Sequence, residues 1–115
     1  MNWADQKSVC ERFGTEFYSC DPGLKVGISR NVLTGLEPLN GMRIPPDGSV
    51  CGWYIWAGGE PSQAPDFYVP LHVIHLHEWA PLAVKYLGLP PGWRFLVTET
   101  YEDVWYDENL LNWGE

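Results

Sequence analysis

Residues 89–111 read LPPGWRFLVTETYEDVWYDENLL, and the rest of the chain is interpreted outward from this stretch. Phe95 and Val97 alternate with their neighbours directly after two prolines and a glycine. This pattern predicts a strand over 93–98 that is entered through a rigid turn. Residues 104–106, VWY, predict a further short strand.

The same stretch places many carboxylates beside large aromatic rings. A packed strand explains a ring such as Trp93, but it does not require unpaired acids next to it. No basic residue follows Arg94. We therefore interpret the segment as a binding surface rather than a catalytic one. The acids are Glu99, Glu102, Asp103, Asp107 and Glu108, and the rings are Tyr101, Trp105 and Tyr106.

The 115 residues are predicted to form a single domain, 1–115, because this length is near the commonest domain size and suffices for one core. Hydrophobic residues make up 45%, which is typical of a globular protein rather than a disordered one. Seven tryptophans contribute to an aromatic content of 15%, more than packing alone usually requires. We expect some rings to be partly exposed at an interface.

The formal net charge is −8, from seven Lys and Arg against fifteen Asp and Glu. This charge repels nucleic acid and anionic membranes, so neither is expected as a partner, and it favours a basic protein through electrostatic steering. A charge of this size also keeps a small protein soluble, which is the alternative explanation. The clustering of acids near the C-terminus favours a partner.

The cysteines and the N-terminus indicate where the protein resides. Cys10, Cys20 and Cys51 are odd in number and lack metal-ligand spacing, which predicts free, mostly buried thiols in a reducing compartment. A Cys10–Cys20 bridge remains the alternative. The N-terminal MNWADQKSV has no apolar core or basic lead of a signal peptide, and no apolar stretch approaches the roughly 18 residues of a membrane span. We expect a cytoplasmic protein.

Elsewhere the patterns predict short elements separated by turns. An apolar stripe of helical period runs through 70–88, and Pro81 divides it. Leu110, Leu111 and Trp113 are expected on the core. The order of elements indicates an α+β fold with a largely antiparallel sheet and two or three short helices. The predicted elements are a helix at 4–13, a strand within 24–33, a loop with little regular structure at 33–49, a strand at 50–60 and helices at 71–79 and 81–87. The stripe consists of Val73, Leu76, Ala80, Ala83 and Leu87.

His72, His75 and His77 are the candidates for a metal site, because three imidazoles fall within six residues. On a helix, however, His77 points about 140° away from His75, so only two of them converge easily. Glu78 is three residues on from His75 and is able to complete a weak site, with Glu60 as a further candidate. Solvated or backbone-bonded histidines are the simpler interpretation, and no cofactor is expected. The alternative is a metal-dependent or small-ligand-binding protein centred on His72, His75 and Glu78.

Catalytic residues are not predicted. Glu102 and Asp103 are adjacent, so in an extended segment they point to opposite faces and are poor partners for acid–base chemistry. No nucleophile or phosphate-binding motif is present in the sequence. Trp53 and Trp56 lie three apart and should face opposite sides of a strand, one towards the core and one towards the surface.

Several pieces of the sequence resemble a known family. They are Pro70–His72, KYLGLPPGWRF at 85–95, YEDVWYD at 101–107 and CGWYIWAGGE at 51–60. Together they are similar to the immunity-protein-33-like domains of bacterial polymorphic toxin systems, over about residues 24–111. The resemblance implies a small cytoplasmic α+β protein without enzymatic activity that binds and neutralises a cognate toxin.

The first hypothesis is therefore a binding module whose acidic, aromatic surface engages a basic protein toxin. The other hypotheses are the metal or ligand protein above and an accessory domain without a tight ligand. The residues predicted to contact the partner are Trp56, Glu60, Glu99, Tyr101, Glu102, Asp103, Trp105, Asp107 and Glu108.

Overall fold

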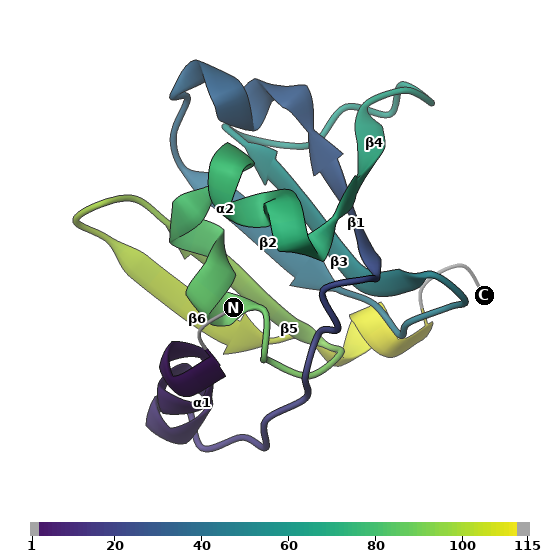
Figure 1. The fold of residues 1–115 in the computed structure, drawn as a ribbon. Helices are drawn as coiled ribbons and strands as arrows, with labels where there is room; N and C mark the ends of the chain where they lie inside the picture. The colour runs from purple at the N-terminus through teal and green to yellow at the C-terminus, as the bar shows by residue number, and fades with distance from the viewer. Residues whose placement is uncertain (1–2, 113–115) are drawn as a thin grey trace.

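The computed structural model describes residues 3–112, which are built around one six-stranded sheet of order β4-β1-β3-β2-β5-β6 (Figure 1). Strands β1 and β3 run parallel, and the other four neighbouring pairs run antiparallel. The predicted α+β fold with a largely antiparallel sheet is confirmed. The strands are β1 (Lys25–Ser29), β2 (Leu39–Arg43), β3 (Val50–Ala57), β4 (Tyr68–His72), β5 (Trp93–Val97) and β6 (Glu102–Tyr106).

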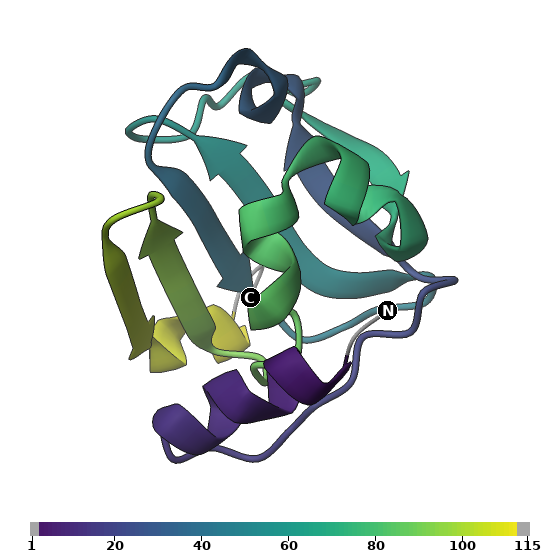
Figure 2. The ribbon, with the colours of Figure 1, turned by 60° about the vertical axis from the view of Figure 1, so that its left-hand side comes forward.

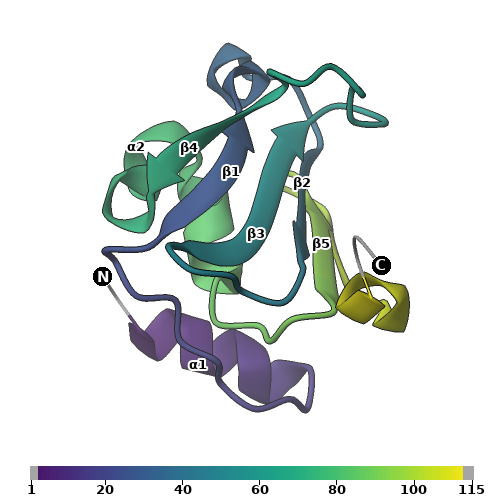
Figure 3. The same ribbon diagram turned by 90° about the vertical axis from the view of Figure 1, so that its right-hand side faces the viewer.

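The helices are short and lie mainly on one face of the sheet. Figure 3 shows α2 and η3 on one side of the sheet and η4 on the other. The N-terminal α1, predicted at 4–13, packs against η3 at the lower end of the molecule in Figure 2. No helix within residues 3–112 has the length and apolar character needed to cross a membrane. The helices are α1 (Trp3–Arg12) and α2 (Leu76–Trp79), with 3-10 helices η1 (Arg30–Thr34), η2 (Val73–His75), η3 (Pro81–Tyr86) and η4 (Glu108–Asn112).

The main core lies between the sheet and the segment 73–87. All five residues of the predicted apolar stripe in this segment are buried. The helix predicted at 71–79 is wrong at its start, because Leu71 and His72 pair with β1 as the end of β4. Pro81 does begin a new helix, although η3 has the tighter 3-10 winding.

The prediction of a loop at 33–49 is wrong, because β2 runs through this segment between β3 and β5. All five of its residues are buried. Gly41 makes this possible, since a Cβ at that position would lie 2.1 Å from the ring of Phe95. The absent side chain lets Phe95 cover the strand, and a residue type that argues against a strand is here required by its packing.

Arg43, at the end of β2, is a charged residue in the core with 1% of its surface exposed. Its guanidinium donates to four backbone carbonyls and lies over the rings of Tyr18 and Trp53. Burial lowers the pKa of Arg43, while the hydrogen bonds satisfy the charged form. The carbonyls belong to Cys51 (3.1 Å), Tyr18 (3.0 Å), Leu87 (3.1 Å) and Leu89 (2.8 Å).

The predicted rigid turn before β5 is present at residues 90–92. Gly92 has a φ of 100°, and a Cβ there would lie 2.5 Å from the ring of Tyr106. Its amide donates to the carbonyl of Arg43 over 2.7 Å, and its carbonyl accepts from Asp107 over 2.7 Å. The turn therefore fixes β5 between β2 and β6.

All three cysteines are free and buried, as predicted, and Cys10 and Cys20 form no bridge. A hydrogen bond with Cys51 and burial together raise the pKa of the Cys20 thiol. Of the residues expected on the core near the C-terminus, Leu110 is buried but Leu111 is 40% exposed. Trp113 lies outside the described residues.

Candidate partner-binding site

The β5–β6 hairpin forms one edge of the sheet and carries most of the predicted site residues. Glu102 lies opposite Val97, and Asp103 lies opposite Leu96. Since directly paired residues share a face, the acids of β6 are divided between the two faces of the sheet. The predicted acids of β6 therefore do not all lie on one face of the sheet.

On the helix-covered face, Glu102 is held by two side chains. Arg12 donates to both carboxylate oxygens over 2.9 and 3.0 Å, and the Tyr86 hydroxyl donates over 2.5 Å. The hydrogen bonds from Arg12 lower the pKa of Glu102 to about 2. Burial and the bond to Glu102 raise the pKa of Tyr86. Glu102 thus links α1, η3 and β6, and its charge is already paired.

On the opposite face, Arg94 lies between Trp105 and Asp107. Its guanidinium is 5.5 Å from the centre of the half-buried Trp105 ring, and its Nη1 lies 3.3 Å from Asp107 Oδ2. Arg94 therefore pairs with Asp107, one of the predicted acids, within the protein itself. Asp103 and Glu108 remain exposed beside it.

Trp56 does not contribute a ring to the surface. It is 4% exposed, it packs with Met42 and Leu110, and its indole N–H donates to the carbonyl of Gly59 over 2.8 Å. Trp53 and Trp56 do face opposite sides of the sheet, but the expectation that one of them faces solvent is wrong. The reason is that η4 places Leu110 over Trp56. Glu60 follows β3 and is exposed.

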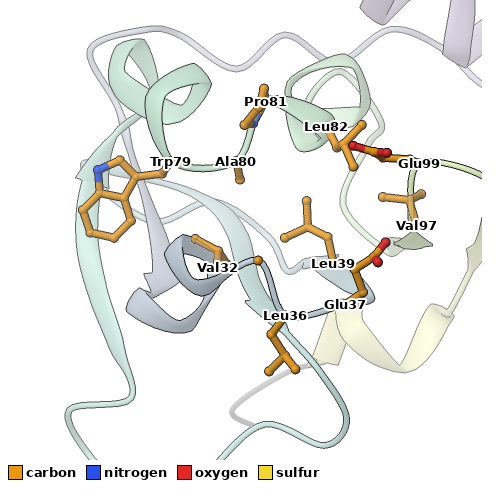
Figure 4. A pocket seen from close by; sticks show the side chains of 11 residues that line it. Val32, Leu36, Glu37, Leu39, Trp79, Ala80, Pro81, Leu82, Val97 and Glu99 are labelled. Atoms are coloured by element: carbon orange, nitrogen blue, oxygen red, sulfur yellow. The ribbon is translucent and has the colours of Figure 1, made fainter.

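A pocket of about 350 Å³ opens where β2 begins and β5 ends (Figure 4). We call it the end pocket. It lies between three segments of the chain, the η1–β2 connection, the junction of α2 with η3, and the residues after β5. Its apolar walls are formed by Leu36, Leu39, Trp79, Leu82 and Val97.

Glu37 and Glu99 are the carboxylates of the end pocket. Leu39 lies opposite Val97 in the β2–β5 ladder, and each glutamate is two residues beyond this pair. Figure 4 shows both at one end of the pocket, with Trp79 at the other. Within residues 3–112 neither carboxylate has a side-chain hydrogen bond or ion pair, and the pocket lining contains no Lys or Arg.

A second hollow, of about 400 Å³, adjoins the end pocket and shares Leu82, Val97 and Glu99 with it. Tyr101, 56% exposed, lines this hollow. Arg12 and Lys85 also line it, so its charges are mixed. Among the predicted residues, Glu99, Tyr101 and Glu102 therefore meet in one region.

Sequence reasoning missed Glu37 and the leucines of the end pocket. Glu37 lies in the glycine- and proline-rich segment that predicted a loop, and no local pattern distinguishes it. Only the pairing of β2 with β5 brings it beside Glu99. Leu36 and Leu82 are 52% and 38% exposed, so both present apolar surface at the pocket.

The candidate metal ligands lie apart from this region. His75 Nδ1 is 2.7 Å from Glu78 Oε2 on α2, and both side chains are exposed. His72, at the end of β4, and His77, bonded to the carbonyl of Ile74, complete the set. Across residues 3–112 no three His, Cys, Asp or Glu side chains gather in a way that holds a metal ion.

Comparison with known proteins gives one match. The model of a family described as the Imm33-like domain matches residues 5–107, which include most of α1 and all six strands. The match begins earlier than the resemblance over 24–111 and takes in most of the N-terminal helix. No curated protein and no solved structure matches the chain.

Proposed function

The chain belongs to the Imm33-like domain family, and from this premise we propose that it is an immunity protein that binds and neutralises a protein toxin without catalysing a reaction. The observation that carries the proposal is the excess of unpaired carboxylates beside exposed apolar side chains at the β5–β6 edge. Glu99, Tyr101 and Asp103 are all exposed there. Such a surface suits a basic protein partner.

The geometry narrows the predicted contact residues. Glu60, Glu99, Tyr101, Asp103 and Glu108 are exposed, and Trp105 offers part of its ring. Of the remaining three, Trp56 is buried beneath the surface, whereas Glu102 is exposed but already bound by Arg12 and Tyr86, and Asp107 is half-buried beside Arg94. A toxin that acts on nucleic acid presents a basic cleft, so it is the kind of partner that this surface fits best. Three buried free thiols suit a reducing compartment, and we propose that binding takes place in the cytoplasm.

The experiment uses the toxin domain encoded beside the gene for this chain. Expressed alone in a bacterial host, the toxin should stop growth, and co-expression of this chain should restore it. The two purified proteins should form a complex on a sizing column, and the complex should weaken as salt is raised. Continued growth arrest with no complex even at low salt would contradict the proposal.

Charge-reversal variants provide the matched control. Glu99→Lys with Asp103→Lys should weaken the complex, since both acids lie at the β5–β6 edge. Asp66→Lys changes an exposed acid just before β4, at the opposite edge of the sheet, and should leave binding unchanged. Circular dichroism should confirm that both variants are folded.

A further inference from the structure

We propose that the end pocket is the anchor site for one arginine side chain of the partner protein. This inference rests on the proposed function and names what the toxin must present. The methylene stem of the arginine lies along the leucine walls, and its guanidinium lies between Glu37 and Glu99. Among residues 3–112, no Lys or Arg lines the pocket, so none of them provides such a cation there.

The apolar walls argue for a side chain with a hydrocarbon stem. Leu36 and Leu82 leave 52% and 38% of their surface exposed at the pocket, and Val97 and Leu39 form buried walls behind them. Covering such exposed surface is favourable, at about 25 cal/mol per Å². A hydrated inorganic cation gains nothing from these walls. Arginine has a stem of three methylenes, which packs on apolar surface while its head remains polar.

The two carboxylates argue for arginine at the charged end. Glu37 precedes β2 and Glu99 follows β5. Within residues 3–112 neither side chain has a hydrogen-bond or ion-pair partner. A guanidinium has five N–H donors in a planar fork, so one group bonds to two separate carboxylates at once. Hydrogen bonds between ionised groups are about twice as strong as neutral ones.

The neighbouring hollow explains why the cation selects the end pocket. Arg12 and Lys85 line that hollow, and Arg12 already holds Glu102. Both cations repel an incoming guanidinium. The end pocket shares Glu99 with the hollow but lacks its cations. The charge pattern therefore directs a basic group to one side of Glu99.

Exposed apolar side chains around the end pocket favour a protein over a free amino acid. Leu36, 52% exposed, lines the end pocket, and Tyr101, 56% exposed, lines the adjoining hollow. Residues flanking the arginine in a partner would cover these side chains. Buried arginines surrounded by such contacts are frequent anchors of protein interfaces.

A peptide titration tests the pocket without the toxin. The probe is acetyl-Leu-Arg-Leu-amide, and the control is the same peptide with neutral citrulline in place of arginine. Added to the ¹⁵N-labelled protein, the arginine peptide should shift the amide signals of Leu36, Glu37, Val97 and Glu99 in a saturable way. The citrulline peptide should bind at least about tenfold more weakly. Equal binding of the two peptides, or shifts confined to other residues, would overturn the inference.

Variants of the two glutamates provide the second test. The double variant Glu37→Gln with Glu99→Gln should lose the preference for arginine, whereas Asp66→Asn should keep it. With the toxin domain, the double variant should bind at least about tenfold more weakly than the native chain. Unchanged toxin affinity in that variant would overturn the pocket and leave the proposed function intact. If the native chain binds no toxin, the proposed function fails, and the peptide titration alone decides on the pocket.

Discussion

Arg43 in β2 donates a hydrogen bond of 2.8 Å to the carbonyl oxygen of Leu89, in the turn that leads into β5. The same guanidinium holds carbonyls of the N-terminal segment and of β3. One buried side chain therefore joins β2 to three other parts of the chain, two of which lie more than 20 positions away. Within residues 3–112 it pairs with no carboxylate, so backbone carbonyls and the rings of Tyr18 and Trp53 surround the charge.

Replacing Arg43 should be costly. Arg43→Met leaves four carbonyls without this donor, and such losses of buried polar partners cost about 3 kcal/mol or more of the free energy of unfolding. Urea unfolding followed by tryptophan fluorescence measures the change. Arg30→Met is the control, because Arg30 is exposed in η1 and its loss should cost less than about 0.5 kcal/mol. Similar small losses in both variants would show that Arg43 is dispensable.

Glu102 should make stability depend on acid pH. Its pKa of about 2 in the folded protein lies below the ordinary value of 4.5, so its contribution is complete above pH 4.5 and is lost as the pH falls towards 2. Glu102→Gln should therefore lower the thermal midpoint most near neutral pH and least near pH 2.

Thermal unfolding followed by circular dichroism between pH 7 and pH 2 checks this expectation. Glu16→Gln is the control, since Glu16 is exposed and has no side-chain bond within residues 3–112. A difference between the native chain and Glu102→Gln that stays constant with pH would contradict the role given to the Arg12–Glu102–Tyr86 contacts.

Two tryptophans should differ in how much they contribute to the free energy of unfolding. Trp56→Ala removes a ring that is 4% exposed beneath Leu110, and we expect a loss of about 3–5 kcal/mol in the free energy of unfolding. Trp105→Ala removes a half-buried ring and should cost clearly less. Chemical denaturation measures both. A smaller effect at Trp56 than at Trp105 would be incompatible with the packing of η4 on the sheet.

The three thiols should not react with a thiol reagent while the protein is folded. Cys10 is 2% exposed, and Cys20 and Cys51 have no exposed surface. Ellman's reagent should therefore modify no thiol of the folded chain within minutes and all three after unfolding in urea. Rapid modification of the native protein would mean that the core opens readily around the cysteines.

Strands could be predicted where the apolar pattern of their own residues indicates a strand. Phe95 and Val97 alternate along β5, and 50–60 is apolar on both faces, so both strands were recognisable locally. Strand β2 was not, because Gly41 and Arg43 are unfavourable in a buried strand until Phe95 covers the glycine and backbone carbonyls surround the guanidinium. Phe95 and the carbonyls of Leu87 and Leu89 lie more than 40 positions away, so these compensating contacts leave no local pattern.

The segment 70–88 shows a second kind of limit. Its apolar stripe correctly identified which residues are buried, because burial depends on which side chains face the sheet. The backbone conformation differs, since β1 recruits Leu71 and His72 into β4 and Pro81 restarts the chain as a 3-10 helix. In the candidate site, the acids of the hairpin were evident from the sequence. Their division between two faces follows only from strand register, and so does the position of Glu37 and Glu99 at one end of the end pocket.

The end pocket is assembled from residues 32–39, 79–82 and 97–99, which meet only when the whole sheet has formed. A partner seated there adds its binding free energy to the native state alone. If a toxin binds there as proposed, the protein should resist heat and proteases longer in the complex than alone.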